Sequence, residues 1–161
     1  MGEYIKDIKI LKEIIETERS KGKKIVFGNG CFDILHVGHI RYLKAAKKLG
    51  DLLIVAINDD QSVAKLGKRK KVVTPAVERA EILTAIGCVD YVITFSEPTV
   101  ERLLLELKPD IHAKGTDYTE ETVPEKDIVL SYGGKVAIVG DPKNHSTSDI
   151  IKTIQNLYEV E

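Results

Sequence analysis

Two histidines at the start of an expected helix carry the most specific chemical signal in this sequence. His36 and His39 follow a turn that contains Gly30, and Gly38 stands between them. Residues three positions apart lie on one face of a helix, so both imidazoles would point the same way. A strand, a glycine-rich turn and a helix N-terminus together present backbone N–H groups to phosphate. We therefore expect both rings to face a phosphate and to stabilise charge that develops at its phosphorus.

The same histidines allow two other interpretations. They could be ordinary polar residues at a helix start, or they could join Asp33 as three ligands of a metal ion. No other group of ligand residues in the sequence supports the metal site, so we expect no metal held by side chains.

A basic segment at residues 65–71 follows the end of an expected strand. A cation from this segment could cover a triphosphate or the attacking phosphate of a second substrate. The alternative is a run of solvated charge without a ligand.

Two further segments are expected at the carboxyl edge of the sheet. Residues 114–118 follow the fourth expected strand, and Gly115 would let a ligand approach the backbone closely. Residues 146–148 open the last expected helix, where their hydroxyls could cap the helix or hold a phosphate. A plain turn is the alternative for the first segment.

The remaining histidines and the cysteines give weaker signals. Cys31 has no evident base beside it, so we expect a small packed residue, and Cys88 is expected in the core. His112 lies in an apolar strand and is expected to be a buried histidine with satisfied hydrogen bonds. A role for His145 at the ligand stays open.

Hydrophobic periodicity predicts the elements that position these residues. Helices are expected over about 4–20, 36–49, 74–86, 98–107, 124–132 and 146–158, and strands over about 24–27, 51–57, 89–95, 110–113 and 135–139. Alternating strands and helices predict an α/β fold, a Rossmann-like, doubly wound, five-stranded parallel sheet with helices on both faces. The helix within residues 1–21 is expected to pack on this sheet.

Length and composition narrow the class of protein. A chain of 161 residues with no linker or repeat predicts a single domain over residues 1–161. The net charge of -1 argues against a nucleic-acid partner. Two cysteines and no long apolar segment predict a cytoplasmic protein without a membrane partner.

The segment at residues 30–39 resembles the HxGH motif of the cytidylyltransferase-like nucleotidyltransferases. Further segments resemble the adenylyltransferase part of the bacterial heptose kinase/adenylyltransferases, without a sugar-kinase domain: residues 29–33, 50–58, 60 with 62–63, 89–90, 109–110, 114–115 with 117–118, 146–148 and 150–151. The resemblance covers the chain from about residue 24 onward, and it implies the nucleotidyltransferase fold.

The heptose branch implies transfer of AMP from ATP to a heptose 1-phosphate, with ADP-heptose for lipopolysaccharide precursors and pyrophosphate as products. Mg²⁺ is expected to accompany the triphosphate. Two alternatives remain: a cytidylyltransferase acting on glycerol 3-phosphate or another phosphorylated alcohol, and a nucleotide-binding module without catalysis. The oligomeric state is open, with a homodimer as one alternative.

The resemblance also implies roles for individual residues. The catalytic residues would be His36, His39, Lys65 and Lys68, the two lysines being chosen from where related cytidylyltransferases carry functional lysines. The nucleotide-binding residues would be Gly30, Cys31, Phe32, Asp33, Gly38, Lys114, Gly115, Asp117, Tyr118, Ser146, Thr147 and Ser148.

One segment and two single residues depart from the related proteins. Residues 143–148 stand in place of an arginine-containing segment of the glycerol-3-phosphate cytidylyltransferases, and the missing arginine counts against that branch. Thr116 stands where heptose proteins usually have a second glycine, and His112 where they tend to have an aliphatic residue. These departures leave the identity of the phosphorylated acceptor open.

Overall fold

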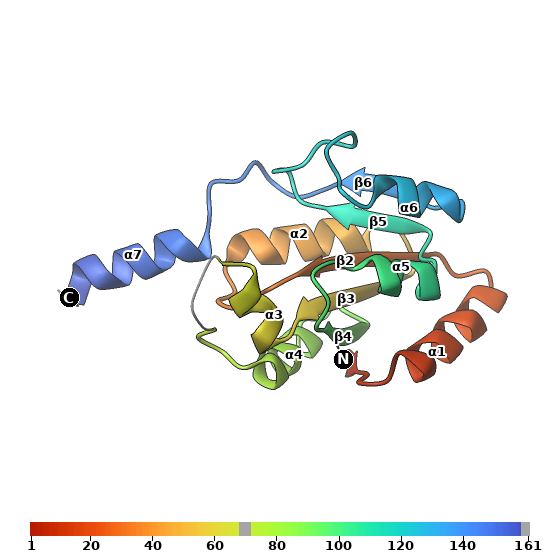
Figure 1. Ribbon diagram of the computed structural model, residues 1–161, viewed down its shortest axis with the longest axis horizontal. Helices are drawn as coiled ribbons and strands as arrows, with labels where there is room; N and C mark the ends of the chain where they lie inside the picture. Colours follow the sequence, from red (N-terminus) through yellow and green to blue (C-terminus); the bar gives the residue numbers. More distant parts are fainter. Residues whose placement is uncertain (68–71, 159–161) are drawn as a thin grey trace.

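Helices and strands alternate along the chain in the computed structural model, which describes residues 1–67 and 72–158 (Figure 1). The elements are β1 (Glu3–Tyr4), α1 (Ile8–Ser20), β2 (Ile25–Gly30), α2 (Val37–Lys47), β3 (Leu52–Asn58), α3 (Asp60–Lys65), α4 (Ala76–Thr84), β4 (Tyr91–Phe95), α5 (Glu101–Leu107), β5 (Ile111–Lys114), α6 (Lys126–Ser131), β6 (Lys135–Ile138) and α7 (Thr147–Tyr158). Within the described ranges, none of these helices is both long and apolar enough to cross a bilayer.

The strands form one parallel sheet in the order β1-β4-β3-β2-β5-β6. Every residue of β3 is buried, as expected for a parallel strand that helices cover on both faces. The predicted α/β fold with a parallel sheet is therefore confirmed. The predicted count of five strands is wrong, because the described sheet has six.

The additional strand is β1, at the edge of the sheet, where the periodicity predicted helix from residue 4. The backbone N–H of Glu3 donates to the carbonyl of Asp90 at 2.9 Å, which holds this segment beside β4. Helix α1 begins only at Ile8, after Asp7 accepts a hydrogen bond from the N–H of Lys9 at 2.8 Å. A strand of two residues is too short to produce a periodic pattern in the sequence.

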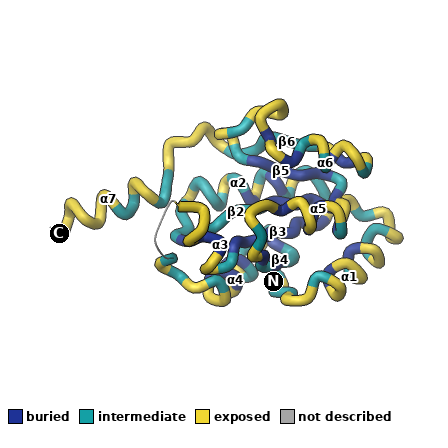
Figure 2. Tube along the Cα trace, viewed as in Figure 1, coloured by how far each residue is buried: buried dark blue, intermediate teal, exposed yellow. Residues whose placement is uncertain are grey.

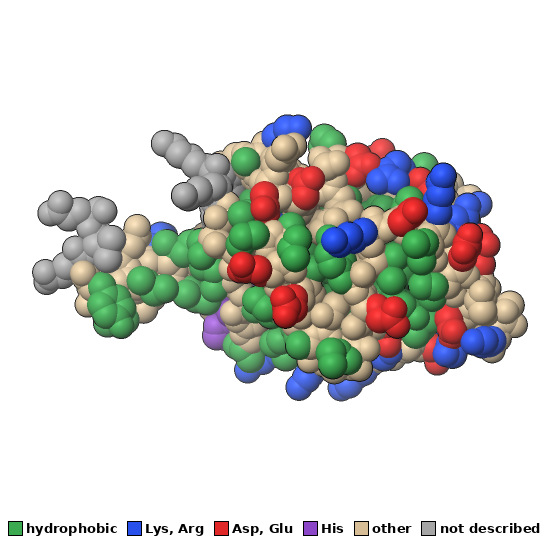
Figure 3. Space-filling view, turned by 90° about the horizontal axis from the view of Figure 1, so that it is seen from below, with side chains coloured by type: hydrophobic (Ala, Val, Ile, Leu, Met, Phe, Trp, Pro, Cys, Tyr) green, Lys and Arg blue, Asp and Glu red, His purple; other side chains and the backbone are tan. Residues whose placement is uncertain are grey.

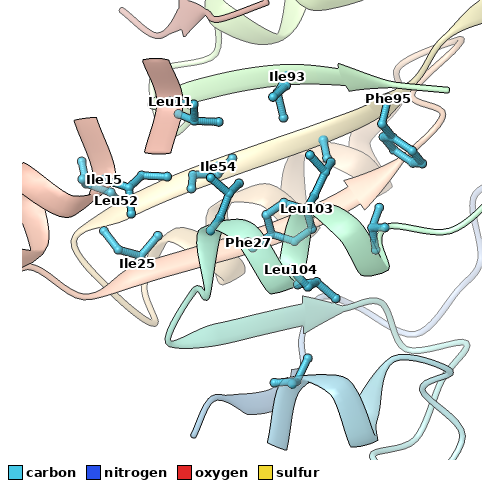
Figure 4. Packing of buried hydrophobic residues seen from close by; sticks show 14 residues of the cluster. Leu11, Ile15, Ile25, Phe27, Leu52, Ile54, Ile93, Phe95, Leu103 and Leu104 are labelled. Carbon is cyan, nitrogen blue, oxygen red and sulfur yellow. The ribbon is translucent and has the colours of Figure 1, made fainter. Parts of the chain in front are cut away.

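Two apolar clusters bury the two faces of the sheet. On one face, helices α1, α5 and α6 pack on the strands, and Figure 4 shows Leu11 and Ile15 of α1 together with Leu103 and Leu104 of α5 beside strand residues such as Phe27. On the other face, helices α2 and α4 supply the buried residues Leu43, Ala46, Ala80 and Leu83. The dark strands at the centre of Figure 2 show the same layering.

The order of the strands reverses at β2. Strands β3 and β4 lie on one side of β2, and β5 and β6 lie on the other. Sheets of this kind bind ligands beyond the carboxyl ends of their strands at such a reversal. In Figure 1, the arrows of β5 and β6 point to the side from which α7 projects, so the turn after β2 opens on that side.

Helix α7 projects away from the body of the molecule (Figure 1). None of its residues from Thr147 to Tyr158 is buried. Figure 3 shows hydrophobic side chains along this helix, and basic and acidic side chains intermixed over the rest of the visible face.

Candidate active site

A cavity of about 600 Å³ lies at the carboxyl ends of β2, β3 and β5, within the size range of small-molecule sites. Both predicted catalytic histidines, His36 and His39, line it. It is also lined by every residue that the sequence analysis assigned to nucleotide binding: Gly30, Cys31, Phe32, Asp33, Gly38, Lys114, Gly115, Asp117, Tyr118, Ser146, Thr147 and Ser148. Segments that are distant in the sequence thus meet where the strand order reverses.

The two predicted lysines are placed differently. Lys65 ends α3 and is exposed, whereas its neighbours Val63 and Leu66 line the cavity. Lys68 lies outside the described residues. A catalytic contribution from either lysine stays a prediction.

His36 and His39 hold each other in a defined arrangement at the start of α2. The Nδ1 atom of His39 accepts a hydrogen bond from the backbone N–H of His36 at 3.2 Å, and Nδ1 of His36 accepts one from the N–H of Gly38 at 3.1 Å. The rings stack with 3.9 Å between centroids. Because both Nδ1 atoms are acceptors, each neutral ring carries its proton on Nε2. The pair therefore has two Nε2–H donors available to a ligand.

Both imidazoles are neutral at pH 7. Burial lowers the pKa of His39 to about 4, and the charge of Lys143, together with any proton on His36, acts in the same direction. Burial also lowers the pKa of His36, with smaller contributions from His145 and Lys143. Neutral rings can donate hydrogen bonds to phosphate oxygens without giving up a proton.

Gly38 makes room for the ring of His36. A Cβ atom at residue 38 would lie 2.9 Å from the Nδ1 and Cε1 atoms of that ring, closer than packed side chains approach each other. The resemblance to the nucleotidyltransferases implies that this glycine binds the nucleotide. The position of the His36 ring requires this glycine as well.

Asp33 lines the cavity but fixes the backbone beside it. The side chain is only 6% exposed, and its Oδ1 atom accepts a hydrogen bond from the N–H of Thr74 at 2.8 Å. Its Oδ2 atom accepts another from the N–H of Val73 at 3.0 Å. This geometry favours a positioning role for the carboxylate, and a contact with nucleotide stays a prediction.

Arg79 lies outside the cavity lining but holds the segments around it, a role that was not predicted from the sequence. Its guanidinium is fully buried and donates to the carbonyls of Cys31, Asn58 and Thr74 at 2.6 to 2.8 Å. It also donates to Asp60 at 2.8 Å. Arg79 thus joins the ends of β2 and β3 to the starts of α3 and α4.

Lys114 lies at the end of β5 and is 8% exposed. Its Nζ atom is 3.4 Å from Oδ1 of Asn29 and 4.5 Å from the ring centroid of Tyr118. Burial lowers the pKa of this ammonium group. Nearby, the Asp117 carboxylate accepts a hydrogen bond from Lys143 at 3.0 Å, so the contact of Asp117 with a nucleoside stays a prediction.

The hydroxyls that open α7 make structural hydrogen bonds. Oγ of Ser146 accepts from the N–H of Asp149 at 3.0 Å, in the manner of a helix cap. Oγ1 of Thr147 donates to the carbonyl of Ile34 at 3.1 Å, which ties α7 to the turn before α2. The ring of His145 lies 6.3 Å from that of His36, beside the same turn.

The side chains that line the cavity indicate how a divalent cation could be bound there. Among the residues that the structure describes, no group of three His, Cys, Asp or Glu side chains has the placement of a metal site. The cavity is lined by neutral imidazoles, by the ammonium groups of Lys114 and Lys143, and by carboxylates that do not form such a group: Asp33, Asp117, Glu125 and Asp141. A cation held by the phosphate oxygens of a nucleotide fits this lining.

A family model described as Cytidylyltransferase-like matches residues 27–154. This span begins in β2, includes both histidines and ends in α7. The chain belongs to the cytidylyltransferase-like family. The resemblance drawn from the HxGH segment is thereby confirmed.

Two curated relatives of this chain are named bifunctional protein HldE. The one from Syntrophotalea carbinolica is 48% identical over 149 residues, which cover 92% of this chain and 30% of the relative. The one from Geobacter metallireducens is 49% identical over 154 residues, 96% of this chain and 31% of the relative. The chain therefore spans about a third of the length of these relatives.

Solved structures show the same fold. A lipopolysaccharide core biosynthesis protein from Thermoplasma volcanium superposes with a TM-score of 0.66 at 32% identity, covering 76% of this chain and 100% of the other. The pantoate-beta-alanine ligase from Francisella tularensis, complexed with beta-gamma ATP and beta-alanine, has a TM-score of 0.64 at 20% identity. The match covers 99% of this chain and 79% of the ligase chain, and it shows a similar fold only.

Proposed function

We propose that this cytidylyltransferase-like chain is an adenylyltransferase that transfers AMP from ATP to a heptose 1-phosphate. The products are ADP-heptose, a lipopolysaccharide precursor, and pyrophosphate. The resemblance of residues 29–33, 114–115 and 117–118 to the heptose branch supports this substrate pair. The HldE relatives and the lipopolysaccharide core biosynthesis protein support it as well.

The reaction needs positioning and charge stabilisation more than covalent work by the protein. A phosphate oxygen of the sugar 1-phosphate attacks the α-phosphorus of ATP. The bond from this phosphorus to the oxygen that bridges it to the β-phosphorus breaks, and pyrophosphate leaves with the electron pair. Negative charge gathers on the oxygens around the α-phosphorus and on the leaving oxygen.

The observation that carries the proposal is the pair of Nε2–H donors of His36 and His39 in the cavity. Donors fixed before the reaction stabilise developing charge without reorganisation. The Nδ1 hydrogen bonds keep both protons on the Nε2 atoms, so the two rings act as hydrogen-bond donors throughout.

Other residues would hold the substrates. We expect the backbone near Cys31 and Phe32 to approach the nucleotide. We expect Asp117 and neighbouring backbone to contact the nucleoside, and residues 146–148 to contact a phosphate. Mg²⁺ carried by the triphosphate would neutralise part of its charge. We expect the reaction in the cytoplasm, where ATP is available, and leave a homodimer as one alternative for the assembly.

Pyrophosphate release tests the proposal. The protein is mixed with Mg²⁺, ATP or CTP, and a panel that includes heptose 1-phosphate and glycerol 3-phosphate. We expect the fastest release with ATP and heptose 1-phosphate. Faster turnover with CTP and an alcohol phosphate would instead establish a cytidylyltransferase. Nucleotide binding without release above background for any pair would establish a non-catalytic module.

A further inference from the structure

Glu125 is a buried carboxylate that lines the same cavity. The residue is 7% exposed, and among the described residues its Oε2 atom has no hydrogen-bond partner. It stands directly before α6, but its side chain makes no hydrogen bond that caps this helix. The architecture of the helix therefore does not explain why a carboxylate is buried here.

The neighbours of Glu125 keep it charged. Nε2 of His112 lies 3.5 Å from its Oε2 atom. Burial raises the pKa of the Glu125 carboxyl, but the His112 ring and the positive charge of Lys114 outweigh burial and hold that pKa below its ordinary value. The carboxylate is thus ionised at neutral pH and acts only as a hydrogen-bond acceptor.

His112 differs from its expected environment. It is fully buried in β5 as predicted, but the prediction of satisfied hydrogen bonds is wrong, because neither ring nitrogen has a partner among the described residues. Its nearest ionisable contact is Glu125.

Glu125 lines the cavity, and the close polar neighbour of its buried Oε2 atom among the described residues is Nε2 of His112, at 3.5 Å. A buried carboxylate with so few hydrogen bonds is unfavourable, and donors on a ligand bound in the cavity would stabilise it. A phosphate group would meet a like charge at Glu125, whereas hydroxyl groups would supply the missing donors. The cavity thus offers neutral imidazole donors to phosphate and a carboxylate acceptor to the uncharged part of a substrate.

We propose that Glu125, positioned by His112 and Lys114, accepts hydrogen bonds from hydroxyl groups of a sugar ring bound in the cavity. The inference rests on the proposed function, in which both substrates carry such a ring. The hydroxyls belong to the ribose of the nucleotide or to the sugar of the acceptor, and the two sources share this chemistry. Glu125 thereby determines specificity for a hydroxylated ring.

Equilibrium binding tests this inference without turnover. Four probes are titrated into the wild-type chain and into Glu125→Gln: ATP, 2′-deoxy-ATP, heptose 1-phosphate and inorganic phosphate. Glutamine keeps the shape of the side chain and removes its charge. The matched control is Glu120→Gln, because Glu120 is an exposed carboxylate on the segment before Glu125.

For a ribose contact, we expect wild type to prefer ATP to 2′-deoxy-ATP by about tenfold or more, the effect of one hydrogen bond to a charged acceptor. Glu125→Gln would lose most of this preference. For an acceptor contact, the preference for heptose 1-phosphate over inorganic phosphate would fall by a similar factor, and the ATP preference would stay. Glu120→Gln should show the same two binding preferences as wild type.

Unchanged preferences in Glu125→Gln would overturn the inference. Equally weakened binding of all four probes would also overturn the inference, because such a result would indicate general damage to the cavity. Failure of pyrophosphate release in the wild-type chain would instead count against the proposed reaction. The binding preferences remain measurable in that case, so the two failures are distinguishable.

Discussion

The ring of Phe32 lies against the ring of His39, with 5.2 Å between their centroids. Phe32 has a φ of 50°, a left-handed conformation that residues other than glycine seldom adopt, and it is 5% exposed. An apolar ring in this place keeps water from the imidazole. This contact contributes to the burial that lowers the pKa of His39 to about 4.

The lowered pKa of His39 predicts that the protein loses stability as the pH falls. In the unfolded chain a histidine takes up a proton near pH 6.5, whereas in the folded chain His39 does so only near pH 4. The neutral ring therefore contributes stability above about pH 6.5, and this contribution is lost as the pH falls from there toward 4. The slope stays below the limit of about 1.4 kcal/mol per pH unit, because the unfolded and folded chains differ by less than one bound proton at this residue at every pH.

Denaturant unfolding at pH 7.5, 6.5, 5.5 and 4.5 measures this dependence. Carboxylates also titrate near the lower end, so the wild-type chain is compared with His39→Asn. We expect the free energy of unfolding to fall less steeply between pH 6.5 and 4.5 in the variant. Parallel curves for the two proteins would contradict the prediction.

His39→Asn also distinguishes the roles of the two ring nitrogen atoms. An asparagine oxygen can replace Nδ1 as the acceptor for the N–H of His36, but nothing replaces the Nε2–H donor. We expect turnover to fall about 100-fold or more, the usual loss when one transition-state donor is removed. The dissociation constant of ATP should change only a few-fold.

Steady-state kinetics and nucleotide titration on the same preparation measure both quantities. His39→Gln is the comparison, because its amide can place an N–H near the position of Nε2, and we expect it to retain more activity. Equal losses in ATP binding and in rate would show that the ring acts in ground-state binding.

The layout of the site could be predicted because it follows from the topology. Carboxyl ends of parallel strands converge at one edge, so residues 36–39, 114–118 and 146–148 could be assigned to one site from their places after strands or before helices. Their convergence on one cavity requires only the α/β alternation, which the hydrophobic pattern shows clearly.

The parts that could not be predicted depend on contacts between distant segments. Arg79 resembles an ordinary helix residue in the sequence, and only the fold brings three carbonyls around its guanidinium. Glu125 was expected within a short helix, and nothing local indicates that it is buried beside His112. Strand β1 depends on its pairing with β4 and has no pattern of its own.

Replacement of Arg79 should strongly destabilise the fold. In Arg79→Met, the carbonyls of Cys31, Asn58 and Thr74 would lose a donor inside the protein. We expect the free energy of unfolding to fall by about 3–5 kcal/mol, as when one partner of a buried ionic network is removed. Urea denaturation measures the change.

The control for this prediction is Arg102→Met. Arg102 pairs with Glu97 and Glu106 at the surface, with about half of its side chain exposed. Exposed ion pairs contribute about 0–1 kcal/mol, so this variant should lose little stability. Similar losses in the two variants would mean that Arg79 does not hold the strand ends together.

Gly38→Ala should impair catalysis while leaving the helix intact. The added methyl group would lie 2.9 Å from the ring of His36, so this ring must move from its stacked position on His39. Small displacements of groups at a reacting centre can cost up to about 100-fold in rate, and we expect turnover to fall at least tenfold. Alanine has a higher helix propensity than glycine by about 1 kcal/mol, so the free energy of unfolding should change less than the steric strain alone would predict.

Gly87→Ala is the control, because a Cβ there meets no atom within 4 Å, and its turnover should equal that of wild type. Full activity in Gly38→Ala would show that the position of the His36 ring is not required for the reaction.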